Sequence, residues 1–316
     1  MFIGVDLGGT NIAVGLVDEN SSLILQKSIP TKSERGYQLV IKDIINLINE
    51  VVLEGNVTED RIKAIGIGIP GIAEPDTGIV INCVNLNWYN VPLKQMLEEE
   101  LKLPVFIDND ATVAGVAEYE AGNMRNAKSG VFITLGTGVG GGIVIDGKVI
   151  RGFNGIASEI GHMIVGENYY SCNCGRNGCL ETFSSSTALI RHTRKLIEEG
   201  NSSSMMGKVN GDLSKINGKV IFEAAKEGDK VASEAIDRLV KYLAIGITNI
   251  IAVIDPEVIA LGGGISSAGE FLLEKVQKEV ERIRYMPMMP VGKIVLAKLG
   301  NEAGIIGAAA LGMLSI

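Results

Sequence analysis

Residues 130–150, GVFITLGTGVGGGIVIDGKVI, repeat a pattern that the chain first shows at residues 2–29, FIGVDLGGTNIAVGLVDENSSLILQKSI. Each stretch begins with an apolar run, passes through a glycine-rich turn and continues as a second apolar run that ends at a polar turn. Apolar runs that flank tight turns are typical of β-hairpins. Because the strand–turn–strand unit occurs twice, it predicts a duplicated domain rather than a solenoid.

Helical and strand patterns alternate along the rest of the chain, which is typical of α/β proteins. Residues 37–54, YQLVIKDIINLINEVVLE, carry apolar residues at helical spacing. Residues 230–254 predict a long helix that ends before Pro256. Residues 200–218 are rich in Gly, Ser and Asn and predict an irregular segment.

Composition excludes several classes of function. The chain has 316 residues, of which 46% are hydrophobic, so it can bury a large core, and its length suggests two domains. A net charge of −8 leaves no basic surface for nucleic acid or for an anionic membrane. No apolar run reaches the roughly 20 residues of a membrane helix, and the first residues lack the basic region of a signal peptide. We expect a soluble, cytoplasmic protein with no nucleic-acid or membrane partner.

The segment 172–181, CNCGRNGCLE, holds three of the four cysteines. Clustered thiols in a reducing compartment more often hold metal or do chemistry than form disulfides. A redox pair usually has the spacing C-x-x-C at the start of a helix, which this segment does not match. Three thiolates leave one tetrahedral position, and His162 lies upstream in SEIGHM. The pattern predicts a structural zinc site on His162, Cys172, Cys174 and Cys179, with unligated loop thiols as the alternative.

The second glycine turn contains Gly136-x-Gly138-x-x-Gly141, the pattern of a dinucleotide-binding loop. That loop requires a helix after the glycines, whereas a hairpin pattern around Asp146-Gly147 follows here. The Walker sequence G-x-x-x-x-G-K-[ST] does not occur. These observations argue against both a Rossmann site and a P-loop site.

Three glycine-rich turns remain, DLGGTN at 6–11, LGTGVGGG at 135–142 and LGGGIS at 261–266. Glycine lets backbone N–H groups approach phosphate oxygens, and the third run is expected to add a helix N-terminus. Asp6 can hold Mg2+ directly or through water. Tight turns without a ligand are the alternative for each run alone, but three runs in a duplicated fold predict a nucleotide site. The residues predicted to bind the nucleotide and its metal are Asp6, Gly8, Gly9, Thr10, Asn11, Thr137, Gly138, Gly262, Gly263 and Gly264.

Further motifs lie in order along nearly the whole chain. They are IGIPG at 67–71, VNLNW at 84–88, DNDATVAGVAE at 108–118, EIGHM at 159–163, FEAAKEGD at 222–229 and LGNEAGIIGAA at 299–309. Together with the glycine turns and the cysteine segment, this set resembles the bacterial ROK family (repressor, open reading frame, kinase) of the hexokinase–actin superfamily, and its glucokinases most of all. One departure is Thr112, where members of the family commonly have Asn, but the pair Asn109-Asp110 is kept.

The resemblance implies an ATP-dependent kinase that phosphorylates the 6-hydroxyl of a hexose, most of all glucose, with Mg2+ at the nucleotide and structural Zn2+. A hydroxyl that attacks a γ-phosphoryl group needs a carboxylate to orient it and take its proton. Asp110 fits this role, with a helix N-cap as the alternative. Glu159 and Glu181 flank the zinc ligands, so the metal loop would position two carboxylates that bind the sugar. The implied sugar-binding residues are Gly71, Asn109, Asp110, Glu159, His162 and Glu181.

Several alternatives stay open, because motifs do not report the shape of a pocket. N-acetylmannosamine, mannose or fructose are alternative substrates, and polyphosphate is an alternative phosphoryl donor. A sugar-responsive transcriptional regulator of the same family is a remote alternative. Such regulators carry DNA-binding helices ahead of the first glycine turn, for which the sequence before Asp6 leaves no room.

The resemblance also implies the duplicated actin-like/hexokinase (ribonuclease H-like) α/β fold, with two domains that face a cleft. We expect a small domain of residues 1–115 with the C-terminal helix 303–316, a large domain of residues 116–302 with the zinc loop, and assembly into a homodimer or homotetramer. Because the glycine turns are remote from the cysteines in sequence, loss of zinc is expected to change nucleotide affinity little.

Overall fold

The computed structural model describes residues 1–316 except the side chain of Glu59, and the chain forms two compact units. Unit 1 consists of Met1–Phe132, Gly142–Ser158 and Ala297–Ile316. Unit 2 consists of Ile133–Gly141 and Glu159–Leu296. A two-unit α/β protein is the fold class that the sequence predicts.

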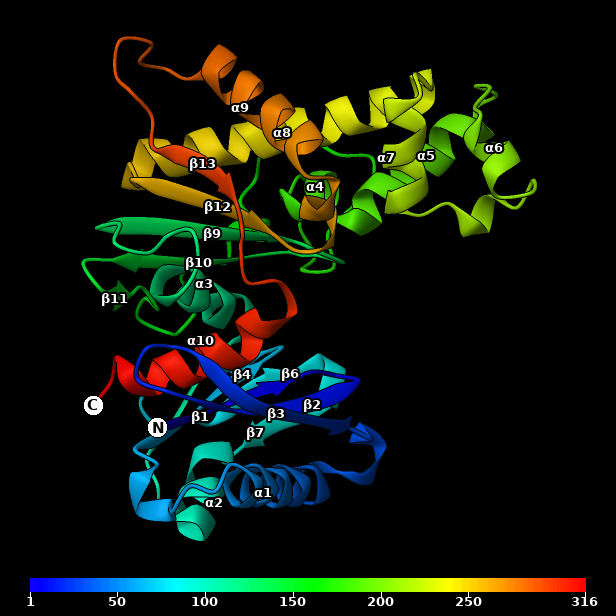
Figure 1. Ribbon diagram of the computed structural model, residues 1–316. Coiled ribbons are helices and arrows are strands. Elements are labelled where there is room, and N and C mark those ends of the chain that lie inside the picture. The colour runs from blue at the N-terminus through cyan, green and yellow to red at the C-terminus, as the bar shows by residue number, and fades with distance from the viewer. The chain divides into compact units, whose positions relative to one another are not determined.

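The first sheet of unit 1 has the strand order β3-β2-β1-β4-β8. Strands β1, β2 and β3 pair antiparallel, whereas β4 pairs parallel to β1 and to β8. The strands are β1 (Phe2–Leu7), β2 (Asn11–Val17), β3 (Leu23–Pro30), β4 (Ala64–Ile69) and β8 (Val105–Asn109). Figure 1 shows helices α1 (Tyr37–Glu54) and α2 (Leu93–Leu101) on one face of this sheet and α10 (Ala303–Met313) on the other. The N-terminal hairpin predicted from the sequence is therefore present.

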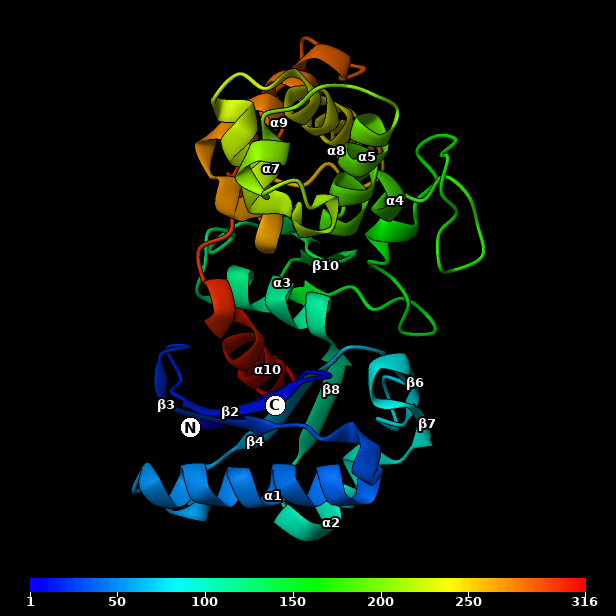
Figure 2. The ribbon, with the colours of Figure 1, turned by 90° about the vertical axis from the view of Figure 1, so that its right-hand side faces the viewer.

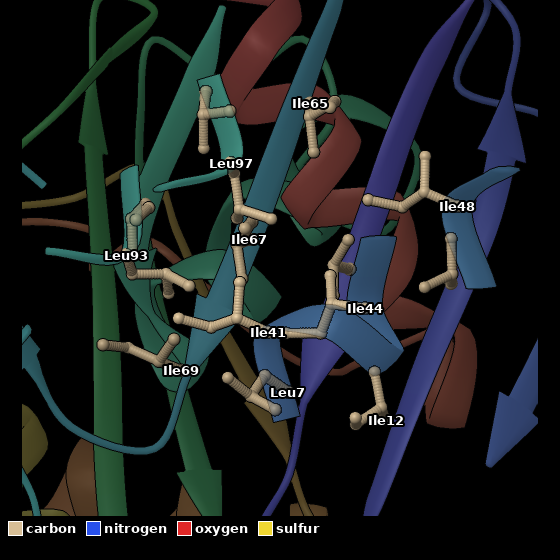
Figure 3. Packing of buried hydrophobic residues seen from close by; sticks show 14 of the residues in the cluster. Leu7, Ile12, Ile41, Ile44, Ile48, Ile65, Ile67, Ile69, Leu93 and Leu97 are labelled. Carbon is tan, nitrogen blue, oxygen red and sulfur yellow. The ribbon is translucent and has the colours of Figure 1, made fainter. Parts of the chain in front are cut away.

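Helix α1 contributes one apolar side to the core of unit 1. Its buried residues recur at helical spacing and include Ile41, Ile44 and Ile48. Figure 3 shows these three side chains among those of the sheet, such as Leu7 and Ile67. Full burial of an aliphatic side chain of this size contributes about 1.5–3 kcal/mol, so this face stabilises the helix far more than its intrinsic propensity does.

The opposite face of the sheet approaches α10 through a row of glycines. Gly4 pairs with Gly15 on one side and with Gly66 on the other. A Cβ on Gly4 would overlap the carbonyl oxygen of Ile305, and a Cβ on Gly66 would overlap that of Ala308. Figure 2 shows α10, in red, crossing this face of the sheet. Only glycine permits this close approach of helix and sheet.

Helix α3 (Asp110–Glu120) belongs entirely to unit 1. The sequence predicts a domain boundary at residue 115, inside this helix, whereas the compact unit extends to Phe132. Val113 and Val116 of α3 form one buried cluster with residues of α10, including Leu311. The last helix of the chain therefore packs with α3 and keeps it in unit 1.

A small three-stranded sheet, β5-β6-β7, lies in unit 1 and is not predicted by the sequence. Its strands are β5 (Ile72–Ala73), β6 (Val80–Cys83) and β7 (Trp88–Val91). Strands of two to four residues are too short to show a clear alternation of apolar and polar residues. Cys83 is buried, as its apolar sequence surroundings indicate.

The second large sheet has the order β11-β10-β9-β12-β13. Its strands are β9 (Ser129–Leu135), β10 (Val139–Ile145), β11 (Lys148–Val149), β12 (Val258–Gly262) and β13 (Lys293–Leu296). The predicted repeat of the hairpin is present, because β9 and β10 are neighbours in this sheet. The chain enters unit 2 within β9 and leaves it within β10.

Helices make up most of the rest of unit 2. They are α4 (Glu181–Ser184), α5 (Ser186–Glu198), α6 (Met205–Lys208), α7 (Gly218–Lys226), α8 (Lys230–Ile254) and α9 (Glu270–Ile283). Helix α8 ends at Ile254, before Pro256, as the sequence predicts, and its C-cap residue Asp255 takes a left-handed conformation. Of the helices described, none has both the length and the apolar character to cross a membrane.

Two features of unit 2 differ from the sequence prediction. The segment predicted to be irregular contains the short helix α6, and helix α7 follows it without having been predicted. The third glycine run leads into a 3-10 helix, Gly264–Ala268, and α9 begins only at Glu270. Gly269 has φ +70°, which interrupts the helical path, so this run does not sit at an α-helix N-terminus.

Candidate functional site

Asn109 and Asp110 lie at the junction of β8 and α3. Asn109 is the N-cap of α3, because its Oδ1 accepts a hydrogen bond from the Ala111 N–H at 2.9 Å. Its Nδ2 donates to the carbonyl oxygen of Gly71 at 3.2 Å. Asp110 is the first residue of the helix and is exposed, and its Oδ1 accepts from the Ala111 N–H at 2.7 Å. The capping role that the sequence left open for Asp110 therefore belongs to Asn109.

Asp108 has no role in the sequence prediction, yet it is buried and paired. Its Oδ2 accepts a hydrogen bond from Nε of Arg151 at 2.6 Å, and its Oδ1 accepts from the Asn109 N–H at 2.9 Å. Burial raises the pKa of Asp108, and the guanidinium of Arg151 opposes this rise. The ion pair holds the end of β8 in place. No local motif predicts this ion pair, because Arg151 lies far along the chain from Asp108. The sequence shows only an acidic residue at the end of a buried strand.

The first glycine turn connects β1 to β2. The Gly8 N–H donates to the carbonyl oxygen of Asn11 at 2.9 Å. Thr31 closes the turn from outside, since its Oγ1 donates to the Gly8 carbonyl at 2.7 Å and its N–H donates to the Thr10 carbonyl at 2.8 Å. Gly9, Thr10 and Asn11 are exposed. The turn is held by a residue that directly follows β3.

Asp6 precedes this turn at the end of β1 and is half-buried. Burial raises its pKa, and no hydrogen bond or ion pair from the described residues opposes that rise. A Cβ on Gly304 would overlap the carboxylate, so glycine at this position lets the first turn of α10 approach it. An uncompensated carboxylate is a suitable oxygen ligand for a hard divalent cation such as Mg2+.

The second glycine turn is held by the start of α5. The carbonyl oxygen of Gly136 accepts a hydrogen bond from the Ser186 N–H at 2.8 Å. The carbonyl oxygen of Thr137 accepts one from Oγ1 of Thr187 at 2.8 Å. The sequence did not predict these contacts, because Ser186 and Thr187 follow the cysteine segment and belong to no recognisable motif.

Glu181 also reaches the second glycine turn. Its Oε2 accepts a hydrogen bond from the Val139 N–H at 3.0 Å. A Cβ on Gly138 would overlap this same oxygen. The other carboxylate oxygen, Oε1, lies 3.8 Å from Sγ of Cys172. Glu181 therefore lies between the turn and the cysteine cluster, which its position in the sequence did not reveal.

The four predicted metal ligands lie together in unit 2. Sγ of Cys174 and Sγ of Cys179 are 3.6 Å apart, and Sγ of Cys172 is 3.7 Å from Nδ1 of His162. One ligand atom from each residue lies within 4.8 Å of all the others. Hydrogen bonds from the backbone and then the side chain of Arg176 lower the pKa of Cys174 to about 6, which favours a thiolate.

The donor set and its spacing fit a closed tetrahedral zinc site. Ligand atoms about 2.0–2.3 Å from one tetrahedral ion lie roughly 3.3–3.8 Å from each other, close to the two separations given above. Three sulfur donors and one imidazole are a common set for structural zinc. With four protein ligands the ion would have no open position for a substrate.

Glu159 and the third glycine run complete the predicted residues of unit 2. Oε2 of Glu159 lies 3.9 Å from Nε2 of His162, and the Glu159 side chain is 41% exposed. Gly263 has φ +82°, and a Cβ there would lie 2.7 Å from the backbone of Leu135. The structure therefore brings the run Gly262–Gly264 against the residue that precedes the second glycine turn. The close packing is a structural reason for Gly263, independent of any ligand.

The chain thus combines two mixed α/β units with glycine turns at strand ends and a Cys3His cluster. The same combination is the one that the sequence motifs led us to expect of a ROK protein. The chain matches the ROK family over residues 2–313. It is 37% identical to the glucokinase of Halalkalibacterium halodurans over 310 residues, 97% of this chain and 93% of the relative. The chain therefore belongs to the ROK family.

Other relatives show how broad this family is. A crystal structure of a ROK family glucokinase from Streptomyces griseus in complex with glucose and AMPPNP is similar, with a TM-score of 0.81 and 33% identity over 98% of both chains. The xylose repressor of Caldicellulosiruptor bescii is 32% identical over 98% of this chain, but this match covers 77% of the repressor. These likenesses confirm the predicted actin-like/hexokinase fold of the family.

Proposed function

We propose that the protein is an ATP-dependent hexose kinase that transfers the γ-phosphoryl group to the 6-hydroxyl of glucose. The observation that carries this proposal is the exposed carboxylate of Asp110 at the N-terminus of α3, next to the Asn109 side chain that caps the helix. The glucokinase of H. halodurans and the S. griseus structure with glucose and AMPPNP support glucose and ATP as the substrates.

Asp110 is the proposed general base. A carboxylate in this position accepts the proton of the sugar hydroxyl as that oxygen attacks the γ-phosphoryl group. The side chain of Asn109 is fixed by its contacts with Ala111 and Gly71 and would orient a neighbouring sugar hydroxyl. The ion pair of Asp108 with Arg151 supports both residues by holding the end of β8.

The remaining sugar contacts are assigned to the residues around the metal cluster. Glu159 and Glu181 would each accept hydrogen bonds from hydroxyl groups, and zinc on the cluster would order the loop that carries them. If Nδ1 of His162 binds the metal, its Nε2 is directed to the side of Glu159, 3.9 Å away. The zinc is structural in this proposal, so it takes no part in phosphoryl transfer.

The nucleotide is assigned to the glycine turns, with Asp6 as a ligand of Mg2+. Mg2+ bound to ATP neutralises charge on the phosphates. Gly9, Thr10 and Asn11 are exposed, and Gly9 has no Cβ that would keep phosphate oxygens from the backbone N–H groups of the turn. The half-buried Asp6 carboxylate lies next to this turn in sequence.

A coupled assay across sugars and donors tests the function. We expect turnover with glucose and ATP to exceed that with mannose, N-acetylmannosamine, fructose or polyphosphate. Asp110→Asn is expected to keep the fold and lower kcat by at least about 10²-fold, since this is the usual cost of losing a positioned base. Asp146→Asn, which changes an exposed aspartate in the turn after β10, is the matched control. Near-normal kcat in Asp110→Asn would remove the base assignment, and no transfer to any hexose would reject the function.

A further inference from the structure

Glu181 contacts two functional elements that the sequence separates widely. It follows the last cysteine of the metal cluster by two positions and reaches the second glycine turn through Val139. We propose that Glu181 is a positioning residue for the phosphate-binding turn as well as a sugar ligand, and that it couples hexose binding to nucleotide binding within unit 2. This inference rests on the proposed kinase function.

The two oxygens of the carboxylate have different surroundings. Oε2 is bound to the Val139 N–H at 3.0 Å, so this N–H group holds the protein's own carboxylate and is not directed to a phosphate. Oε1 lies on the side of the metal cluster, 3.8 Å from Cys172 Sγ. One oxygen thus holds the turn, while the other accepts from the Cys172 thiol in the metal-free chain. A zinc-bound Cys172 would be a thiolate without this proton, which would leave Oε1 to accept a hydrogen bond from a sugar hydroxyl.

The same carboxylate lies where a side chain at position 138 would be. A Cβ on Gly138 would overlap Oε2 of Glu181, although no such obstacle lies near Gly136. A side chain at position 138 would therefore displace the carboxylate of Glu181 from its present position.

A pocket of about 330 Å3 joins the two elements. Thr137 and Gly138 of the turn, Cys172 of the cluster and Glu181 all line it. Residues at the start of α5 complete the wall, including Thr187, which also binds the turn. A ligand group that enters this pocket meets the turn and the metal loop together.

The coupling follows from this arrangement. A hydroxyl that donates to Oε1 restricts the rotation of the carboxylate and thereby stabilises the hydrogen bond that the Val139 N–H donates to Oε2, which keeps the turn in one conformation. Hydrogen bonds to an ionised carboxylate are stronger than neutral ones, so the turn gains order. Linkage requires the effect to be reciprocal: bound sugar raises nucleotide affinity by the same factor as bound nucleotide raises sugar affinity.

Glu159 provides a matched control for Glu181. It is the second carboxylate proposed to bind the sugar, and it lies 3.9 Å from the imidazole of His162. None of its described contacts reaches the second glycine turn. A role limited to the sugar should therefore be shared by both residues, whereas the coupling should depend on Glu181 alone.

The test uses calorimetry with zinc-loaded protein, magnesium AMPPNP and glucose, each ligand measured with and without the other. Glu159→Ala is expected to weaken glucose binding and leave AMPPNP binding unchanged. Glu181→Ala is expected to weaken both, AMPPNP by about tenfold even without glucose, and to abolish their mutual enhancement. Glu181→Gln should regain most of the AMPPNP affinity, because its amide carbonyl can still accept the Val139 N–H.

Unchanged AMPPNP affinity and mutual enhancement in Glu181→Ala would overturn the coupling while leaving the kinase proposal intact. Glucose binding that survives in both alanine variants would instead contradict the proposed sugar site. Zinc content is measured for each variant. If Glu181→Ala loses zinc, Gly138→Ala replaces it, since the added Cβ displaces the same carboxylate without changing a residue near the metal ligands. Full mutual enhancement in Gly138→Ala would then overturn the inference.

Discussion

The two glycine turns of the repeated hairpins look alike in sequence but are supported in different ways. The first, at residues 8–11 between β1 and β2, is closed by Thr31, which directly follows the next strand, β3. The second, at residues 136–138, is held by Ser186 and Thr187 at the start of α5, about fifty residues further along the chain. Two turns with similar sequences are therefore held by different kinds of contact. The first turn depends on its own hairpin, and the second depends on the segment that follows the metal cluster.

Substitution of one glycine in each turn should separate these two kinds of support. Gly138→Ala places a methyl group against Glu181 and is expected to lower kcat/KM for glucose and for ATP, each by about 10²-fold, because a displacement near 1 Å has costs of this size. In Gly9→Ala the added Cβ would lie 3.3 Å from Cβ of Asn85 and 3.7 Å from its carbonyl oxygen, and the variant is expected to raise KM for ATP alone. Steady-state kinetics with each substrate varied provides the measurement. Equal effects of the two variants on both substrates would remove the distinction.

Removal of one zinc ligand should show whether the second turn depends on the metal loop. Cys174→Ser is expected to lose zinc and to raise KM for glucose by about tenfold or more. It is also expected to lower the affinity for AMPPNP, because α4 and α5, which hold the second turn, begin just after the last cysteine. The sequence alone predicted almost no change in nucleotide affinity, so this measurement decides between the two views. Elemental analysis and calorimetry follow both quantities.

Cys83→Ser is the control for that experiment, because Cys83 is buried in β6, outside the cluster. It should retain one zinc per chain and unchanged ligand affinities. Zinc-free protein with full activity would reject the structural role of the metal.

The smallest expected effects come from the two threonines that bind the turns. Thr31→Val and Thr187→Val each remove one hydrogen bond from a side chain to a turn carbonyl, worth about 0.5–1.5 kcal/mol, so affinities should change by a few-fold. Thr31→Val should weaken AMPPNP whether or not glucose is present. Thr187→Val should weaken AMPPNP and also reduce its enhancement by glucose. Enhancement lost in Thr31→Val but kept in Thr187→Val would contradict the comparison.

Many elements of the fold were predictable because their signals are local. Helix α1 matches the predicted residues 37–54, because its apolar residues recur at helical spacing. Helix α8 matches 230–254, because Pro256 follows its end. The close spacing of three cysteines with one histidine predicted the metal cluster for the same reason. Short strands β5, β6 and β7 escaped prediction, because two to four residues carry too little pattern.

Other features depend on contacts between distant segments, so only the tertiary structure decided them. The sequence by itself determined two hairpins with glycine turns, the pair Asn109-Asp110 at the end of a strand and a Cys3His set. It did not determine that Arg151 pairs with buried Asp108 or that Gly304 faces Asp6. Nor did it show that Glu181 holds the second turn through Val139. Hydrogen bonds and close approaches of this kind leave no periodicity in the sequence, because their partners are brought together only when sheets and helices pack.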